Sequence, residues 1–90
     1  MSATCVPLGH TVITPAALSA LSEIDIEVAL MRHARCDWGI VDDHDREANE
    51  RALQHGDRLL SIFRSEAGEK FYVITEWDRS ATTVLLPEDY

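Results

Sequence analysis

Two of the three residue types that a ribonuclease can use, glutamate and arginine, occur in the C-terminal part of this chain as Arg58, Glu76 and Arg79. A glutamate can take the proton from a ribose 2′-hydroxyl, while an arginine steadies the phosphate and a histidine protonates the leaving oxygen. Glu76 and Arg79 are only three positions apart, so we expect their carboxylate and guanidinium at the same end of a sheet. These three residues are a candidate catalytic site.

A histidine is missing from this candidate site, because all four histidines precede residue 58. The expected order of elements, with helices first and an antiparallel meander after them, nevertheless resembles that of the barnase-like ribonucleases and related toxins. The resemblance implies a ribonuclease-like toxin, or a descendant of one that has lost its activity. An acidic surface would repel RNA, which is an argument against this hypothesis.

The alternative is that residues 77–80, Trp-Asp-Arg-Ser, only connect two strands. Asp78 and Ser80 can stabilise a turn through hydrogen bonds from side chain to backbone, and Arg79 can pair with a nearby carboxylate. We interpret this segment as a turn, which leaves the chain without assigned catalytic residues.

Residues 42–45, Asp-Asp-His-Asp, have the side chains of a metal site. A calcium loop of the EF-hand type needs glycine at its sixth position, but counting from Asp43 that position is Ala48. His44 and His55 would share a helix face yet lie roughly 16 Å apart, too far for one metal ion to bridge. A capped and solvated helix start explains the same residues, so we expect no metal and no other cofactor.

Motifs of nucleophilic or phosphate-binding enzymes, such as GxSxG, HExxH or a glycine-rich loop, do not occur in the sequence. Cys5 and Cys36 lack the paired spacing of a zinc site, and two cysteines are too few for a secreted disulfide scaffold. Asp37 should raise the pKa of the adjacent Cys36 thiol. We expect reduced, inert thiols and favour a protein that is not an enzyme.

Sixteen acidic residues against eight basic ones give the chain a net charge of −8. Binding to nucleic acid or to an anionic membrane needs clustered cations, so this composition argues against both. Residues 37–50 hold six acidic side chains and one arginine. The charge favours a basic partner or none, and in the second case the acidic face only keeps the domain soluble. The candidate partner-binding residues are Asp42, Asp43, Asp45, Glu47 and Glu50.

The N-terminal part of the chain predicts a weak strand and a short helix. Strand character over residues 6–13 ends at Thr14 and Pro15, which suit an N-cap and a first helical position. The helix that follows carries Leu18 and Leu21 on one side.

A second helix is expected over residues 26–35, with Asp25 as its N-cap. Trp38 then adds a large apolar side chain to the core, and Gly39 can take the left-handed conformation that ends this segment. The buried stripe of this helix, spaced i, i+3, i+4 and i+7, consists of Ile26, Ala29, Leu30 and His33.

The third helix has the clearest ends, with Asp42 or Asp43 as its cap and Gly56 after its last turn. Acidic residues in its first turns suit the helix dipole. Its apolar stripe is thin, so the helix should show a wide acidic face to solvent. The members of the stripe are Ala48, Ala52 and Leu53.

Beyond residue 58 the hydrophobic period becomes that of strands. Residues 58–64, 70–76 and 81–87 are rich in β-branched and aromatic side chains and are separated by turn signals. We predict a three-stranded antiparallel meander that the N-terminal strand can join. The fold expected for residues 1–90, a single domain, is α+β: two or three helices packed on one face of a three- or four-stranded antiparallel sheet.

Four segments, "TPAALSAL", "RHARCDWG", "NERALQHGDRLLS" and "VITEWDRSATTVLLPEDY", occur in this order. Together they resemble a family of short bacterial proteins carried on plasmids, phages and genomic islands, some loosely described as type I restriction subunits. The resemblance implies that the chain comes from a mobile genetic element. Small acidic proteins of such elements often occupy the basic surfaces of nucleic-acid enzymes, as anti-restriction and anti-CRISPR proteins do. We therefore expect a non-catalytic, acidic interaction protein that inhibits a host defence complex.

The first ten residues, "MSATCVPLGH", hold neither a basic stretch nor a long apolar run, so we expect no targeting signal. The longest apolar runs of the chain are too short to cross a bilayer. The expected location is the cytoplasm, without membrane contact, and the oligomeric state stays open.

The chain ends in Pro87, Glu88, Asp89 and Tyr90. Pro87 has no N–H to donate and should end the last strand. The Tyr90 ring can either fold back onto the sheet edge or stay exposed and extend a partner-binding surface. We expect it to fold back, because burial of a tyrosine contributes about 1–3 kcal/mol.

Overall fold

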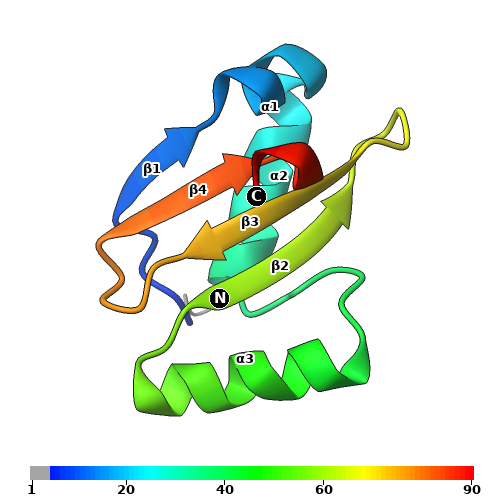
Figure 1. The fold of residues 1–90 in the computed structure, drawn as a ribbon. Coiled ribbons are helices and arrows are strands. Elements are labelled where there is room, and N and C mark those ends of the chain that lie inside the picture. Colours follow the sequence, from blue (N-terminus) through cyan, green and yellow to red (C-terminus); the bar gives the residue numbers. More distant parts are fainter. Residues whose placement is uncertain (1–4) are drawn as a thin grey trace.

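Four strands form one sheet in the order β1-β4-β3-β2 (Figure 1). The computed structural model describes residues 5–90. Our expectation of no targeting signal concerns residues 1–10, and residues 1–4 lie outside the described part of the chain. The strands are β1 (His10–Ile13), β2 (Leu59–Arg64), β3 (Lys70–Thr75) and β4 (Ala81–Leu85).

The three C-terminal strands form the antiparallel meander that the sequence predicts. Side chains alternate between the two faces of the sheet, as a strand requires. In β2, Leu59, Ser61 and Phe63 are buried on one face, and Leu60 and Ile62 are half-buried on the other. The meander therefore has one face that packs in the core and one that is more open.

β1 joins this meander beside β4 in the parallel direction, with His10 opposite Ala81. The sheet is therefore mixed and not antiparallel throughout. β1 is also shorter than residues 6–13, since it starts only after Gly9. At Gly9 φ is +64°, and a Cβ atom would lie 2.4 Å from the carbonyl oxygen of Ser80, so glycine is needed where these two segments meet.

α1 (Pro15–Ala20) begins where Thr14 and Pro15 predict, with the Ala17 N–H donating to the Thr14 hydroxyl oxygen at 3.2 Å. Ala17 is buried, whereas Leu18 is 62% exposed. The side of the helix that packs is therefore that of Ala17.

α2 (Glu23–Ala34) begins earlier than expected, because Ser22 and not Asp25 is its N-cap. The Asp25 N–H donates to the Ser22 hydroxyl oxygen at 3.1 Å, and Asp25 stands in the first turn, where the helix dipole favours a carboxylate. The expected stripe is confirmed: Ile26, Ala29 and His33 are buried and Leu30 is half-buried.

α3 (Asp43–His55) has the ends that the sequence predicts. The Asp45 N–H donates to the Asp42 carboxylate at 2.8 Å, and Gly56 follows the last turn with a φ of +76°. Asp42 is thus the N-cap, and Gly56 takes the left-handed conformation that commonly ends a helix.

α3 is not among the two or three helices that we expected on the sheet face, which are α1 and α2. The helix runs along the outer edge of β2 (Figure 1), and Asn49 binds the backbone of Leu60 there. The packed side of α3 consists of Asn49 and Ala52, each 3% exposed. Leu53, which we expected to pack, is 37% exposed. Ala52 therefore packs as predicted, and the polar Asn49 packs beside it in place of Leu53.

α1 and α2 supply the helical residues of the main core, and α2 crosses behind the sheet in Figure 1. The α+β prediction is confirmed. Trp38 is buried, as expected, in a smaller cluster with Val6, Ala52 and Leu59. Within residues 5–90, no helix has the length and hydrophobicity to cross a membrane. The main core contains Ala17, Leu21, Ile26, Ala29, Phe63, Phe71, Val73, Val84 and Leu86.

The last residues form a 3₁₀ turn, η1 (Pro87–Asp89), directly after β4, so Pro87 ends the strand region as expected. The Tyr90 ring meets the Tyr72 ring edge to face with centroids 5.9 Å apart, yet Tyr90 is 72% exposed. The ring thus folds back onto a strand of the sheet as expected, but the expectation that it is buried there is wrong. Asp89 makes the closer tie, because its carboxylate accepts hydrogen bonds from the Thr14 hydroxyl at 2.7 Å and the Leu86 N–H at 3.1 Å.

Candidate functional site

The outer side of α3 carries an acidic stripe, which we define as Asp43, Glu47 and Glu50. These residues are spaced i, i+4 and i+7, so at about 100° per residue they point in nearly the same direction. Asn49 and Ala52, which pack at the sheet edge, lie on the opposite side of the helix. All three carboxylates of the acidic stripe are therefore presented to solvent.

The other two predicted binding residues, Asp42 and Asp45, lie apart from the acidic stripe. Asp42 caps the helix, and Asp45 is half-buried towards the packed side. Within the stripe, Asp43 pairs with Arg46. Glu47 and Glu50 form no ion pair with any described side chain, so they are the carboxylates most open to a partner.

Two polar contacts fix α3 to the sheet. The Asn49 side-chain amide donates to the Leu60 carbonyl at 2.7 Å and accepts from the Leu60 N–H at 3.0 Å. Nearer the C-terminal end of the helix, the Arg79 guanidinium donates to the Ala52 carbonyl at 3.0 Å. The acidic stripe is therefore held in a fixed orientation relative to the sheet.

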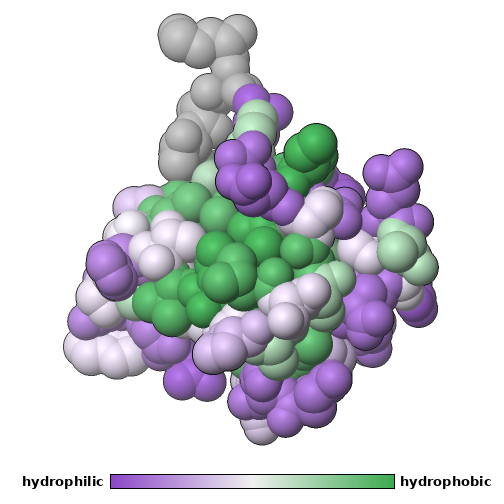
Figure 2. Space-filling model, turned by 90° about the horizontal axis from the view of Figure 1, so that it is seen from above, coloured by the Kyte–Doolittle hydropathy of each residue, from purple (hydrophilic) through white to green (hydrophobic). Residues whose placement is uncertain are grey.

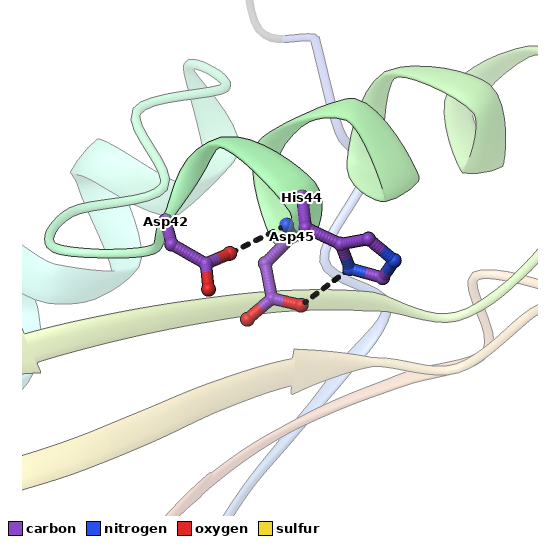
Figure 3. A group of neighbouring side chains, drawn as sticks. All are labelled: Asp42, His44 and Asp45. Atoms are coloured by element: carbon purple, nitrogen blue, oxygen red, sulfur yellow. Dashed lines mark hydrogen bonds and ion pairs between the residues drawn. The ribbon is translucent and has the colours of Figure 1, made fainter.

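Asp42, His44 and Asp45 place three candidate metal ligands together at the start of α3 (Figure 3). Their ligand atoms lie within 4.8 Å of one another, and His44 Nδ1 is 3.7 Å from Asp45 Oδ1. Two observations argue against a metal site. One Asp42 oxygen already accepts a hydrogen bond as the helix cap, and the positive end of the helix dipole disfavours a cation. The His44 side chain is also 85% exposed. The group is a solvated helix start and does not make a built metal site.

The candidate catalytic residues do not act together. Arg58 Nη2 lies 3.3 Å from Glu76 Oε1, which is a partly exposed ion pair. The Arg79 guanidinium instead donates to backbone carbonyl oxygens at 2.6–3.2 Å, those of Asp57, Glu76, Trp77 and Ala52. An arginine occupied in this way is not available to hold a phosphate.

The segment 77–80 has the contacts expected of a turn. The Ser80 N–H and hydroxyl both donate to Asp78 Oδ1, at 3.0 and 2.6 Å, and these bonds lower the pKa of the Asp78 carboxyl. Arg79 adopts a left-handed φ of +62°. The expectation that Arg79 pairs with a carboxylate is wrong. Its partners are backbone carbonyls, and one of them, that of Ala52, belongs to the last turn of α3.

A buried chain of polar side chains, which sequence patterns did not reveal, connects α2 to the sheet. His33 Nδ1 lies 2.6 Å from the Ser61 hydroxyl, and His33 Nε2 lies 2.8 Å from the Thr75 hydroxyl. Thr75 in turn lies 2.7 Å from Thr82, whose hydroxyl donates to the Leu8 carbonyl at 2.7 Å. The only sequence signal was His33 within an apolar stripe.

The hydrogen bond from Thr82 to the Leu8 carbonyl fixes the direction of the hydrogen bonds that connect Thr82 back to His33. Because Thr82 gives its proton to a carbonyl, Thr75 must donate to Thr82, and His33 Nε2–H must donate to Thr75. The buried imidazole is neutral, so Nδ1 carries no proton and accepts from Ser61. Burial, and secondarily the positive charge of Arg79, lowers the pKa of His33 to about 4. Ser61 and His33 are both fully buried and cannot meet a substrate.

Hydrophobic side chains gather in a patch on the end of the molecule that carries α1, seen from above in Figure 2. Leu18 and Ile24, at 62% and 71% exposure, belong to the helices at this end. A groove of about 250 Å³ lies between α2 and the β2–β3 hairpin, with Phe63 and Phe71 among its lining residues. Its charged lining residues carry both signs, so its charge favours no particular partner.

Trp77 is a second feature that sequence patterns did not single out as a surface. It is 65% exposed in the β3–β4 turn. Arg79 binds the carbonyls of both Trp77 and Ala52, which places the turn beside the C-terminal end of α3. An exposed tryptophan on a fixed turn is the kind of side chain that anchors protein interfaces.

Comparisons of the chain with models of known protein families, with curated proteins and with solved structures find no match.

Proposed function

We propose that this chain is a non-catalytic interaction protein of a mobile genetic element, and that the outer face of α3 binds a basic groove on a protein that handles nucleic acid. In a bacterial host, the target would be a defence complex of the restriction or CRISPR kind, which the chain inhibits in the cytoplasm. The observation that carries the proposal is the acidic stripe, turned away from the packed side of α3.

The fixed position of the stripe supports this function. Asn49 holds α3 at its middle and Arg79 holds it near its C-terminal end, so little conformational entropy is lost when a partner binds its outer face. Complementary charges steer a basic partner to the stripe and set the specificity of the complex. Trp77, beside the C-terminal end of α3, supplies apolar contact area that carboxylates lack.

The charge of the molecule supports a protein partner over a nucleic acid. A net charge of −8 repels phosphate backbones, whereas it attracts the basic channels through which defence enzymes hold DNA or RNA. By occupying such a channel, the acidic stripe would compete with nucleic acid. Contacts between charges also make the proposed binding weaker at high salt.

The test is a bacterium with an active restriction or CRISPR system, transformed with a plasmid that the system targets. Expression of the chain should raise the number of transformants. Replacing Glu47 and Glu50 by lysine should abolish most of this gain, because the stripe would then repel a basic groove. These two side chains make no ion pair with described residues, so the variant should fold.

The matched control replaces Glu27 and Glu69 by lysine. Both are exposed, one on α2 and one in the β2–β3 loop, and the net charge changes from −8 to −4 in either variant because each replacement adds two charges. The control should protect the plasmid as well as the unmodified chain does. Equal loss in both variants would show a general charge effect, and no gain with the unmodified chain in either defence system would refute inhibition.

A further inference from the structure

The only two cysteines of the chain, 31 positions apart in sequence, meet at the C-terminal end of α2. The N–H groups of Cys5 and Val6 both donate to the Ala34 carbonyl, at 2.8 and 3.0 Å. Cys36 follows Ala34 by two residues and packs against the cluster that contains Val6. The backbone thus holds the two cysteines beside each other.

The conformation of Cys36 is unusual for its residue type. The Cys36 and Asp37 N–H groups donate to the carbonyls of His33 and Arg32, at 3.0 and 2.9 Å, which is the hydrogen-bond pattern of a Schellman helix end. Cys36 occupies the left-handed position of this motif with a φ of +65°, where glycine is the usual residue. The Cys36 thiol is therefore carried by a backbone conformation that is strained for a residue with a side chain.

The two thiols also interact. Burial, then a hydrogen bond with the Cys5 thiol, raises the pKa of the Cys36 thiol to about 12. Cys5 is exposed and Cys36 half-buried, so a small oxidant can reach the pair from the Cys5 side. Glu50 of the acidic stripe adds to the raised pKa of Cys36, but the contact between the two cysteines does not depend on the proposed function.

We propose that Cys5 and Cys36 form a redox-active dithiol, which a low-molecular-weight disulfide such as oxidised glutathione closes into an intramolecular disulfide. Cys5 loses its proton and attacks one sulfur of the oxidant, which forms a mixed disulfide and releases one thiol of glutathione. Cys36 then loses its proton and attacks the Cys5 sulfur, which displaces the second glutathione as a thiol. Two protein thiols are oxidised and one glutathione disulfide is reduced to two thiols.

The closed bond would fasten the segment before β1 to the end of α2. It removes conformational freedom from the unfolded chain between residues 5 and 36, so the closed form should be more stable than the open form. The dithiol therefore couples the redox state of the surroundings to the stability of the fold.

The experiment equilibrates the purified full chain with mixtures of reduced and oxidised glutathione and measures the intact mass after acid quenching. The expected product is a monomer lighter by two hydrogens, with a melting temperature several degrees above that of the reduced chain. In urea, the same conversion should need at least about tenfold more oxidised glutathione relative to reduced, since only the folded chain holds the thiols together.

Two variants control for the assignment. Cys5→Ser, at an exposed position, and Cys36→Gly, which suits the left-handed φ, should each fold and should form no intramolecular bond. The proposal is overturned if the unmodified chain stops at a glutathione adduct or a disulfide-linked dimer. It is equally overturned if the folded chain closes no more readily than the chain in urea.

Discussion

The side-chain amide of Asn49 takes the place of a neighbouring strand at Leu60, because it both donates to the carbonyl and accepts from the N–H of this edge residue. Gly39 pairs with the same edge of the sheet through an isolated parallel β-bridge to Ile62. Backbone groups of β2 that would otherwise be open to pairing with another chain are thus satisfied within the molecule.

Replacing Asn49 by alanine should therefore lower the free energy of unfolding by about 1–3 kcal/mol, since two hydrogen bonds at a buried site are lost. The melting temperature should fall by roughly 4–8 °C for each kcal/mol. Urea unfolding followed by circular dichroism measures the change. Gln54→Ala, on the exposed side of the same helix, is the control and should have little effect; equal stabilities of the two variants would refute the role of Asn49.

The ends of α3 and the meander could be predicted from the sequence because their determinants are local. Asp42 and Gly56 act on the backbone within one turn, and each strand alternates by itself. The parallel pairing of β1 and the edge position of α3 depend on contacts between distant residues, such as Thr82 with Leu8 and Asn49 with Leu60. No spacing along the chain encodes these pairs.

The candidate site follows the same division. The acidic character of α3 is a matter of composition, and the sequence predicts it. Which carboxylates face solvent depends on which side of α3 packs, and that is the side of Asn49 and Ala52. Arg79 was expected to bind a carboxylate because side-chain charge is visible in a sequence, whereas the open carbonyls at the end of α3 are not.

The buried His33 should make the fold sensitive to acid. Its pKa is about 4 in the folded chain, below the ordinary value of 6.5, so protons bind more tightly to the unfolded chain. The stabilisation is complete above pH 6.5 and is lost as the pH falls from 6.5 towards 4, by about 3 kcal/mol in total. Urea unfolding at intervals across this range measures the loss.

The variant His33→Gln isolates this contribution. Glutamine cannot titrate, so the difference in unfolding free energy between the unmodified chain and the variant should shrink as the pH falls from 6.5 to 4. Gln54→Ala, at an exposed position on α3, replaces no titratable group and should show a constant difference. A pH-independent difference for His33→Gln would contradict the neutral, buried imidazole.

The side-chain hydrogen bonds of Arg79 should stabilise the fold, whereas its left-handed backbone conformation should destabilise it. Arg79→Ala loses the hydrogen bonds to four carbonyls, and we expect a loss of about 2 kcal/mol. Arg79→Gly loses the same bonds but relieves the left-handed φ of +62°, so it should be about 1 kcal/mol more stable than the alanine variant. Urea midpoints measure both, and equal midpoints would exclude strain at this residue.

Glu76→Gln should change little. The ion pair with Arg58 is partly exposed, with 54% and 34% of the two side chains accessible, and such pairs contribute less than about 1 kcal/mol. Induction of the unmodified chain in a bacterium should leave growth unaffected, and so should the variant. Growth arrest that Glu76→Gln relieves would instead support a ribonuclease-like toxin.

The C-terminal tail should stabilise the fold through Asp89 more than through Tyr90. The Asp89 carboxylate accepts from the Thr14 hydroxyl, and Thr14 is also the N-cap of α1, so one side chain joins the end of the chain to the start of a helix. Asp89→Asn weakens both of its hydrogen bonds and should lower the melting temperature by several degrees, or about 1 kcal/mol. Removal of Tyr90 alone should cost less, because 72% of this residue is exposed. Differential scanning calorimetry of the two variants ranks them, and a larger loss for the Tyr90 deletion would show that the contact between Tyr90 and Tyr72 is the stronger tie.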